Sequence, residues 1–346
     1  MKAKITPAVD HTNRHRLVDV LPLPAPYTIY IEPTRACNLK CFFCMHATRD
    51  IPGGVFEQTG YKIHHMPQEL YSKVVRDISE FPEQPKKITY SGLGEPLMNP
   101  HLPEMVKEMR DSGYENRLEI ITNGVALTHE LSRKLIDAGL SRINISVEGL
   151  TANKYEEVCQ VRVDMEKYLD EIRYFYKYSR GKCEVYIKII DAELDSKEDE
   201  QKFYSMFGDF CDMIYVEHLL ILEQQMGDHG GRVDSTKNLY SEPVKELKVC
   251  AVATYFLSLN ADGDVFPCPV VGLPHSFALD NVTKKPLAAI WNGKSRNTFL
   301  QEMFKGNVRK IDVCKTCHTF CCVQDGTEDL DNDMDEILER YQKVAG

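Results

Sequence analysis

Short apolar runs alternate along the chain with longer segments in which apolar residues recur at helical spacing. The short, β-rich runs predict six strands, over residues 27–32, 87–90, 118–122, 142–147, 184–190 and 213–218. The longer segments predict helices, over residues 67–78, 102–112, 129–138, 165–178 and 197–207. Such alternation indicates parallel strands joined by crossover helices, and six strands are fewer than the eight of a closed barrel. We therefore predict an α/β fold with a partial (β/α)6 TIM-like barrel.

The alternation breaks down toward both ends of the chain. Residues 1–26 are polar and end in Leu-Pro-Leu-Pro-Ala-Pro, which favours extended backbone. Beyond Leu219 the helical and strand patterns stop, until residues 255–265 predict a hairpin that turns at Asn260-Ala-Asp-Gly-Asp. An acidic helix that covers a seam is expected near the C-terminus. The predicted organisation is an arm over 1–26, the barrel over 27–220, a connection over 221–249, a second domain over 250–324 and a helix over 325–346.

Composition narrows the range of partners. The 346 residues are 43% hydrophobic, which is enough for one large core and a smaller second one. The net charge of -10 argues against contact with phosphate backbones, so we expect no nucleic-acid partner. The sequence shows neither an apolar run of about 18 residues nor the short apolar segment of an export signal. We therefore expect a cytoplasmic protein that does not enter membranes.

Clustered cysteines carry the strongest chemical signal. The chain has 12 cysteines, and in a reducing compartment clustered thiols more often bind metal than form disulfides. Cys37, Cys41 and Cys44 have the spacing CxxxCxxC directly after the first predicted strand. Soft thiolates suit iron–sulfur clusters or zinc, and three of them leave one iron of a four-iron cubane open. Structural zinc and free core thiols are the alternatives, although zinc usually takes a fourth nearby Cys or His.

The stretch Arg35-Ala-Cys-Asn-Leu-Lys-Cys-Phe-Phe-Cys44 resembles the cluster loop of the radical S-adenosylmethionine (SAM) superfamily. The resemblance implies that these three cysteines bind a [4Fe–4S] cluster whose open iron is chelated by SAM, with Phe43 near the adenine. It also implies reductive cleavage of SAM to a 5′-deoxyadenosyl radical. The electron would come from an external reductant such as flavodoxin or ferredoxin.

Further motifs of that superfamily end the next predicted strands, and the resemblance covers roughly residues 27–220. Ser91-Gly-Leu-Gly-Glu-Pro96 resembles the GGEP motif, whose backbone pairs with the SAM amino group. Thr122-Asn-Gly124 and Ser146-Val-Glu-Gly149 resemble contacts to the methionine and ribose, with Glu148 where Asp is commoner. Lys188 is either a partner of the SAM carboxylate or an exposed strand lysine. The residues that the resemblance assigns to SAM are Phe43, Gly92, Gly94, Glu95, Asn123, Ser146, Glu148 and Lys188.

A second cysteine set follows the barrel and consists of Cys250, Cys268, Cys314 and Cys317. It resembles the Twitch module, a shortened SPASM domain that binds one auxiliary [4Fe–4S] cluster. A zinc ribbon uses the same four ligands. The run from Cys314 to His318 also matches the c-type haem motif CxxCH, but haem attachment normally occurs outside the cytoplasm. We therefore expect SAM and two [4Fe–4S] clusters as the cofactors.

The remaining cysteines fall into two groups. Cys159, Cys183 and Cys211 are isolated and are expected to be buried structural thiols, whereas Cys321 and Cys322 lie beyond the second set. Radical epimerases return a hydrogen atom to the substrate from a thiol. For such a reaction the candidate donors are Cys183, Cys211, Cys321 and Cys322.

The reaction expected from the resemblance is hydrogen abstraction from a small sugar, polyol or aminocyclitol. A cluster with four protein thiolates has no open iron, which favours electron acceptance and hence dehydrogenation. The arm is too short for the peptide-recognition domain that many peptide modifiers carry. Epimerisation, peptide or protein modification, and a non-enzymatic zinc-binding module stay open as alternatives. Polar residues between the two modules are candidate substrate contacts, namely Glu217, His229 and Arg232.

Overall fold

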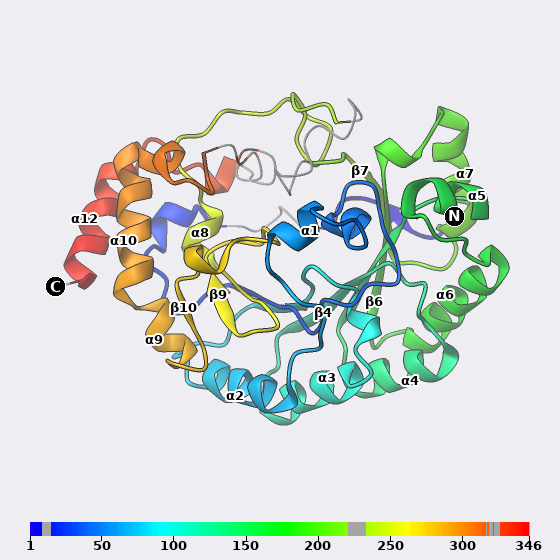
Figure 1. Cartoon of the computed structure of the whole chain (residues 1–346), viewed down its shortest axis with the longest axis horizontal. Coiled ribbons are helices and arrows are strands. Elements are labelled where there is room, and N and C mark those ends of the chain that lie inside the picture. The colour runs from blue at the N-terminus through cyan, green and yellow to red at the C-terminus, as the bar shows by residue number, and fades with distance from the viewer. Residues whose placement is uncertain (9–14, 221–232, 316, 318–320, 322–325, 346) are drawn as a thin grey trace.

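The computed structural model describes residues 1–8, 15–220, 233–315, 317, 321 and 326–345. One continuous sheet of ten strands runs through this part of the chain, in the order β1-β7-β6-β5-β4-β3-β2-β8-β9-β10 (Figure 1). Its central strands are parallel and confirm the predicted α/β fold of the partial-barrel type. They are β2 (Thr28–Ile31), β3 (Lys87–Tyr90), β4 (Arg117–Thr122), β5 (Arg142–Val147), β6 (Glu184–Ile190) and β7 (Met213–Glu217).

Helices cover the outer face of these strands, and several of them follow the lower rim of the molecule in Figure 1. Each turns an apolar stripe inward, as α2 does with Tyr71, Val74 and Ile78. Several of them have an N-cap residue whose side-chain oxygen accepts a hydrogen bond from the first turn. At the start of α4, for example, the Thr128 hydroxyl accepts from the Leu131 N–H. The helices on the outer face are α2 (Gln68–Ser79), α3 (Leu102–Asp111), α4 (His129–Asp137), α6 (Met165–Ser179) and α7 (Lys197–Phe207). The short helices α1 (Val55–Gln58) and α5 (Ala152–Cys159) follow the cysteine loop and β5, respectively.

The sheet curls, so that strands far apart in its order face one another across the interior. Burial raises the pKa of Tyr30 on β2, and the charges of Lys188 on β6 and Glu217 on β7 also act on its hydroxyl. Strands β2 and β7 are separated by four others in the sheet order, so this proximity requires the barrel-like curvature. The interior of the barrel therefore contains a polar layer.

The N-terminal arm belongs to the fold more closely than the sequence predicted. Strand β1 (Lys4–Ile5) pairs in parallel with β7 and extends the sheet. Farther along, Arg340 donates to the carbonyl of Val18 at 2.6 Å, and the Trp291 indole N–H donates to the Leu23 carbonyl at 3.1 Å. The arm thus lies against the C-terminal helices.

The C-terminal part begins with α8 (Val252–Tyr255) and continues the sheet. Strand β8 pairs in parallel with β2 and antiparallel with β9, which confirms the predicted hairpin. The expected terminal helix is α12, which begins at Met334, later than the domain boundary predicted at 325. The domain boundaries themselves stay predictions. The other elements here are β8 (Phe256–Leu259), β9 (Asp264–Phe266), β10 (Asp280–Asn281), α9 (Leu287–Trp291), α10 (Lys294–Glu302) and α12 (Met334–Ala345).

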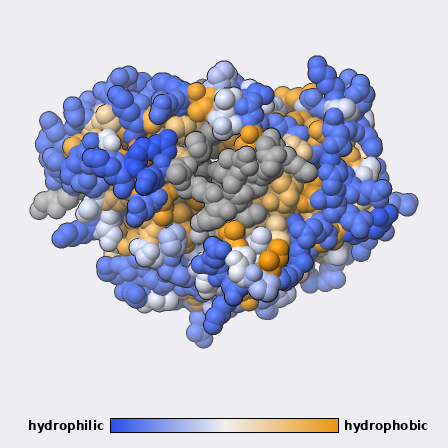
Figure 2. Space-filling model, turned by 45° about the horizontal axis from the view of Figure 1, so that its top comes forward, coloured by the Kyte–Doolittle hydropathy of each residue, from blue (hydrophilic) through white to orange (hydrophobic). Residues whose placement is uncertain are grey.

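The surface gives no sign of a bilayer-spanning element within the described residues. None of their helices combines the length and the apolar character needed to cross a membrane. On the face shown in Figure 2, the outer rim is hydrophilic and apolar residues gather toward the centre. This view brings forward the side on which α1 lies in Figure 1, next to the first cysteine loop.

Candidate cluster and cofactor site

The loop that carries the first three cysteines leaves the C-terminal end of β2. The Leu39 N–H donates to Cys37 Sγ and the His46 N–H donates to Cys44 Sγ, each at 3.5 Å. Cys41 Sγ lies 3.5 Å from Cys159 Sγ. Backbone donors aimed at sulfur favour the thiolate form that iron requires, although at Cys37 burial outweighs them and raises the pKa to about 12. The donor set and its surroundings therefore fit an iron–sulfur cluster with three protein ligands.

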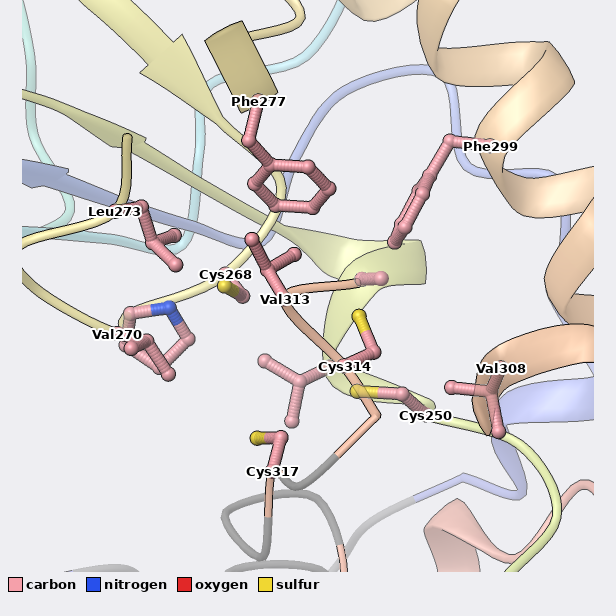
Figure 3. Close-up of a pocket in the computed structure, with 13 residues that line it drawn as sticks. Cys250, Cys268, Val270, Leu273, Phe277, Phe299, Val308, Val313, Cys314 and Cys317 are labelled. Carbon is pink, nitrogen blue, oxygen red and sulfur yellow. The ribbon is translucent and has the colours of Figure 1, made fainter. Parts of the chain in front are cut away.

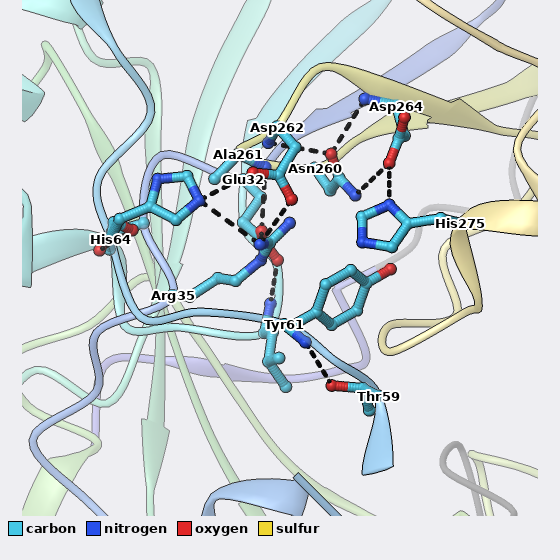
Figure 4. A network of polar contacts seen from close by, with 12 residues as sticks. Glu32, Arg35, Thr59, Tyr61, His64, Asn260, Ala261, Asp262, Asp264 and His275 are labelled. Atoms are coloured by element: carbon cyan, nitrogen blue, oxygen red, sulfur yellow. Dashed lines mark hydrogen bonds and ion pairs between the residues drawn. The ribbon is translucent and has the colours of Figure 1, made fainter. Parts of the chain in front are cut away.

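Glu32, at the end of β2, joins three segments through one carboxylate (Figure 4). Its Oε1 accepts from Arg35 Nε at 2.8 Å and from the Ala261 N–H at 3.0 Å. Its Oε2 accepts from the Leu93 N–H at 2.9 Å. A methyl group on Gly92 would meet Glu32 Cγ at 2.5 Å, so this close approach requires glycine. The cysteine loop, the glycine loop and the β8–β9 turn are thereby fixed to one another.

Arg35 is the buried cation of this network, with 1% of its surface exposed. Its guanidinium pairs with Asp262 Oδ2 at 2.7 Å and lies 4.1 Å from the centre of the Tyr61 ring. His64 Nε2 lies 2.9 Å from the other oxygen of Asp262. Although burial opposes it, the hydrogen bond from Arg35 lowers the pKa of Asp262. The charges of Glu32, Arg35 and Asp262 therefore hold the C-terminal part against the cysteine loop (Figure 4).

Glu95 directs its carboxylate into the protein. The carboxylate accepts from Thr122 Oγ1 at 2.5 Å, the Asn123 N–H at 2.8 Å and the Leu97 N–H at 3.0 Å. Burial raises the pKa of Glu95 to about 7. The Glu95 N–H donates to the Ala36 carbonyl at 2.8 Å, beside the cysteine loop. Glu95 therefore joins the ends of β3 and β4, and its role toward SAM stays a prediction.

Asn123 connects the end of β4 with the cysteine loop. Its Nδ2 donates to Asn38 Oδ1 at 2.8 Å, and its Oδ1 accepts from the Val125 N–H at 2.9 Å. The Tyr168 hydroxyl donates to the Asn123 carbonyl at 3.0 Å. The structure thus brings Asn123 and the cysteine loop together, and the role of Asn123 toward SAM stays a prediction.

Lys188 forms an ion pair inside the barrel. Its Nζ lies 2.5 Å from Glu217 Oε2, with 25% of the lysine side chain exposed and 6% of the glutamate side chain. The Tyr186 hydroxyl donates to Glu217 Oε1 at 3.0 Å. Although burial opposes it, Glu217 raises the pKa of Lys188. Ser146 lies beside Lys188 in the register of β5 and β6, so two predicted site residues are neighbours.

Glu148 is buried next to a second carboxyl group that the sequence did not single out. Glu148 is 7% exposed and Glu193 is 2% exposed. Burial raises the pKa of both groups, and the charge of Glu148 adds to the effect on Glu193. Two such carboxyl groups cannot both ionise at low cost, which favours the protonated form of at least one of them. The one sequence feature that could have indicated Glu193 is its position three residues beyond the end of β6, on the side where the other predicted site residues lie.

The second cysteine set converges on one cavity (Figure 3). The cavity measures about 40 Å³ and is otherwise lined mainly by apolar side chains such as Leu273, Phe277 and Phe299. Burial raises the pKa of Cys268 and Cys314 to about 12. Four convergent thiols are the ligand set of a [4Fe–4S] cluster or of structural zinc. The cavity is lined by the four cysteines of the predicted set, Cys250, Cys268, Cys314 and Cys317.

Arg309 organises the CxxC turn, and sequence reasoning missed it. Its Nη1 shares its two N–H groups among the carbonyls of Cys314 at 3.3 Å, Lys315 at 3.5 Å and Cys317 at 2.7 Å. The guanidinium therefore holds the backbone at Cys314 and at Cys317, the two cysteines of the CxxC motif. The positive charge also lies close to ligands that become anionic when they bind metal.

Two of the predicted hydrogen-donor cysteines, Cys183 and Cys211, lie away from the cluster loop. Cys183 lies just before β6 and Cys211 just before β7, so both are at the N-terminal ends of their strands. The cluster loop follows the C-terminal end of β2, and these strands run parallel. Cys321 is buried in the C-terminal part. Cys322, like His229, Arg232 and His318, lies outside the described residues.

Family models match both cysteine-bearing parts. A model of the radical SAM superfamily matches residues 31–197, and a SPASM model, described as an iron–sulfur cluster-binding domain, matches residues 250–318. A tungsten-containing aldehyde ferredoxin oxidoreductase cofactor-modifying protein of Pyrococcus furiosus is 26% identical over 305 residues, which are 78% of this chain and 82% of the relative. A probable GTP 3′,8-cyclase of Methanococcus maripaludis is 34% identical over 125 residues, or 36% of this chain and 37% of its own.

Solved structures share the fold. Streptococcus suis SuiB bound to S-adenosylmethionine aligns with a TM-score of 0.59 and 15% identity, over 86% of this chain and 72% of SuiB. Native anSMEcpe with bound AdoMet aligns with a TM-score of 0.57 and 15% identity, over 92% of this chain and 99% of anSMEcpe. BtrN in complex with AdoMet and 2-DOIA aligns with a TM-score of 0.55 and 16% identity, over 84% of this chain and 92% of BtrN. The cofactors expected from the cysteines, SAM with iron–sulfur clusters, are those of the matched families. The chain belongs to the radical SAM superfamily and carries a SPASM iron–sulfur cluster-binding domain.

Proposed function

We propose that this chain is a radical SAM dehydrogenase of a small hydroxylated metabolite, such as a sugar, a polyol or an aminocyclitol. The observation that carries the proposal is the convergence of four thiols on one apolar cavity in the SPASM part. A cluster with four protein thiolates has no coordination position left for a substrate, so it is suited to accept an electron. BtrN, which shares the fold, was crystallised with AdoMet and the small molecule 2-DOIA.

Residues on several strand ends would prepare the two cofactor sites. Cys37, Cys41 and Cys44 would hold the first cluster, and the backbone of the glycine loop together with Asn123 would position SAM. When loaded, this site would supply a 5′-deoxyadenosyl radical that removes a hydrogen atom from a hydroxyl-bearing carbon, and the auxiliary site would take up an electron as the substrate loses a proton to become a carbonyl compound. An external flavodoxin or ferredoxin would supply the starting electron.

The polar layer of the barrel supports a hydroxylated substrate. Lys188 and Glu217 form an ion pair at 2.5 Å, and a quarter of the lysine side chain is exposed. Such a pair offers both donors and acceptors to hydroxyl and amino groups. Tyr186 contributes a further hydroxyl to the same carboxylate. We propose that these residues orient the substrate beneath the radical site.

The test uses the anaerobically reconstituted full chain with dithionite, SAM and a panel of sugars, polyols and aminocyclitols that includes 2-DOIA. A double Cys314→Ala, Cys317→Ala variant should still form 5′-deoxyadenosine but should give no oxidised product. Chromatography with mass spectrometry measures both compounds. An inverted stereocentre that carries solvent deuterium, without an oxidised product, would instead identify an epimerase.

A second candidate is a peptide or protein maturase. The chain covers 98% of anSMEcpe with bound AdoMet and Cp18Cys peptide, at a TM-score of 0.55. A likeness of this kind supports peptide access to the same architecture. Turnover of a cysteine- or serine-containing peptide, with no turnover of any member of the metabolite panel, would favour this candidate over the dehydrogenase.

A further inference from the structure

We infer that Cys159 donates an S–H···S hydrogen bond to Cys41 and thereby raises the reduction potential of the first cluster. The inference rests on the proposed role of Cys37, Cys41 and Cys44 as its ligands. Cys159 belongs to neither cysteine set and comes from α5, outside the cysteine loop. It would be a positioning and tuning residue, since it acts on the cluster through one of the ligands.

The end of α5 holds the cysteine loop by its backbone. The Lys40 N–H donates to the Cys159 carbonyl at 3.0 Å, and the Phe42 N–H donates to the Val158 carbonyl at 2.9 Å. These two bonds lie on either side of Cys41. The helix ends at Cys159, and the following residue, Gln160, has a φ of 56° that turns the chain away. The position of Cys41 relative to Cys159 is therefore fixed by main-chain contacts and does not depend on side-chain rotamers alone.

The two sulfurs meet in a buried environment. Cys41 Sγ and Cys159 Sγ are 3.5 Å apart, and Cys159 is 0% exposed, so water does not compete for its proton. A carboxylate oxygen of Glu148 lies within 4.8 Å of both sulfurs. As the proposed iron ligand, Cys41 binds through its thiolate sulfur, which can only accept a hydrogen bond, whereas the Cys159 thiol has an S–H to donate. The direction of the hydrogen bond follows from this difference.

A donor to a cluster sulfur withdraws electron density and stabilises the more negative, reduced cluster. The neighbouring end of α5 has the opposite tendency, because a helix C-terminus carries partial negative charge. Two of its last carbonyls are bound by the loop N–H groups, which leaves the thiol as the donor that acts directly on the ligand. We therefore expect the potential to fall when the thiol is removed.

The test is an EPR-monitored redox titration of the reconstituted full chain and its Cys159→Ala variant. The first cluster is identified by the change of its signal when SAM is added. In the variant the ratio of reduced to oxidised cluster at a fixed potential should fall roughly tenfold, which is 59 mV for a one-electron couple. Cys211→Ala is the matched control, because its buried thiol donates to the Phe207 carbonyl at 3.4 Å, and it should leave the potential unchanged.

A second variant allows the same test if the Cys159→Ala protein does not assemble the first cluster. Cys159→Val fills a similar volume without a donor and should lower the potential to the same extent. An unchanged potential in a Cys159 variant that retains its iron would overturn the inference. Absence of a SAM-sensitive cluster from the unmodified chain would count against the proposed function instead, so the two failures are distinguishable.

Discussion

At the scale of single residues, burial disfavours the thiolate, metal-binding form of several proposed ligands. Burial raises the pKa of Cys37, Cys268 and Cys314 to about 12, so their thiols are protonated at neutral pH in the metal-free protein. The thiolate is the ligand of iron, so each of these groups must release a proton when a cluster forms. Metal binding and proton release are therefore coupled.

Iron loading of the folded, metal-free chain should rise with pH. A higher pH favours the products of a reaction that releases protons, so more iron should be incorporated at pH 9 than at pH 7 for a given free iron and sulfide. Iron analysis after anaerobic reconstitution in a series of buffers measures the effect. Loading that is independent of pH would show that the thiols are already ionised before iron binds.

Arg309 should be needed for the auxiliary site. Arg309→Gln removes the cation that binds the carbonyls of Cys314, Lys315 and Cys317, so the two cysteines should no longer be held together by one side chain. About half of the iron should be lost while the SAM-sensitive EPR signal persists. Arg162→Gln is the control, because Arg162 lies on the surface and pairs with Glu156 there. Full iron content in the Arg309 variant would contradict the assignment.

The sequence revealed those site residues that belong to a motif within one short stretch of the chain. Cys37, Cys41 and Cys44 were found by spacing within one loop, and the glycine loop by its motif. Cys159 was assigned only a structural role, because its contact with Cys41 spans 118 positions. The bond between Glu32 and Ala261 spans 229 positions, so no local pattern announces it. Contacts of this kind depend on how the strands are ordered.

At the scale of elements, the close packing of loops should make Gly94 irreplaceable. A methyl group there would collide with the Thr34 carbonyl oxygen and lie 2.7 Å from that of Ala36. Gly94→Ala should therefore displace the cysteine loop, cost about 1–3 kcal/mol and reduce the iron of the first cluster. Gly326→Ala is the control, since no described residue lies within 4 Å of its added methyl group. Urea unfolding and iron analysis compare the two, and equal behaviour would refute the packing argument.

Glu32 should matter for stability because it neutralises Arg35. In Glu32→Gln the guanidinium loses a charged partner while both groups stay buried, which typically costs about 3 kcal/mol. The urea midpoint should fall accordingly. Glu130→Gln breaks an exposed ion pair with Lys134 and should leave the midpoint unchanged. If both variants unfolded at the same urea concentration, Asp262 alone would suffice as the counter-ion of Arg35.

Elements with a clear period were predicted with accurate bounds, whereas others were missed. Strands β3, β5 and β6 and helix α7 begin and end where the sequence placed them. Helix α5 is only eight residues long, too short to establish a helical period. Helix α10 was missed because it buries Arg296 and Asn297 beside Leu300, so polar residues occupy its inner face. Strand β1 is two residues long and gives no pattern.

At the scale of the whole molecule, the two separate cysteine sets predict two iron–sulfur cluster sites that are loaded with iron independently of each other. The reconstituted chain should bind about eight irons, four for each cluster. Changing Cys37, Cys41 and Cys44 together to Ala should leave about four, and Cys314→Ala with Cys317→Ala should leave the other four. Cys183→Ala, which alters a thiol just before β6, should retain all of them. Zinc at the second site would contradict the auxiliary cluster but would leave the first site untouched.

The continuity of the sheet limits how such a chain can be recombined. Strand β8 occupies the outer edge of β2, with Thr28 opposite Phe256 and Ile31 opposite Leu259. A chain cut after residue 220 would uncover that edge, and an uncovered edge strand invites pairing with other chains and aggregation. The C-terminal part is therefore not an independent module that can be exchanged without regard to the rest of the sheet. An exchange of residues 250–318 between relatives would have to deliver a strand that fits β2, so strand compatibility would constrain inheritance as strongly as the cysteines do.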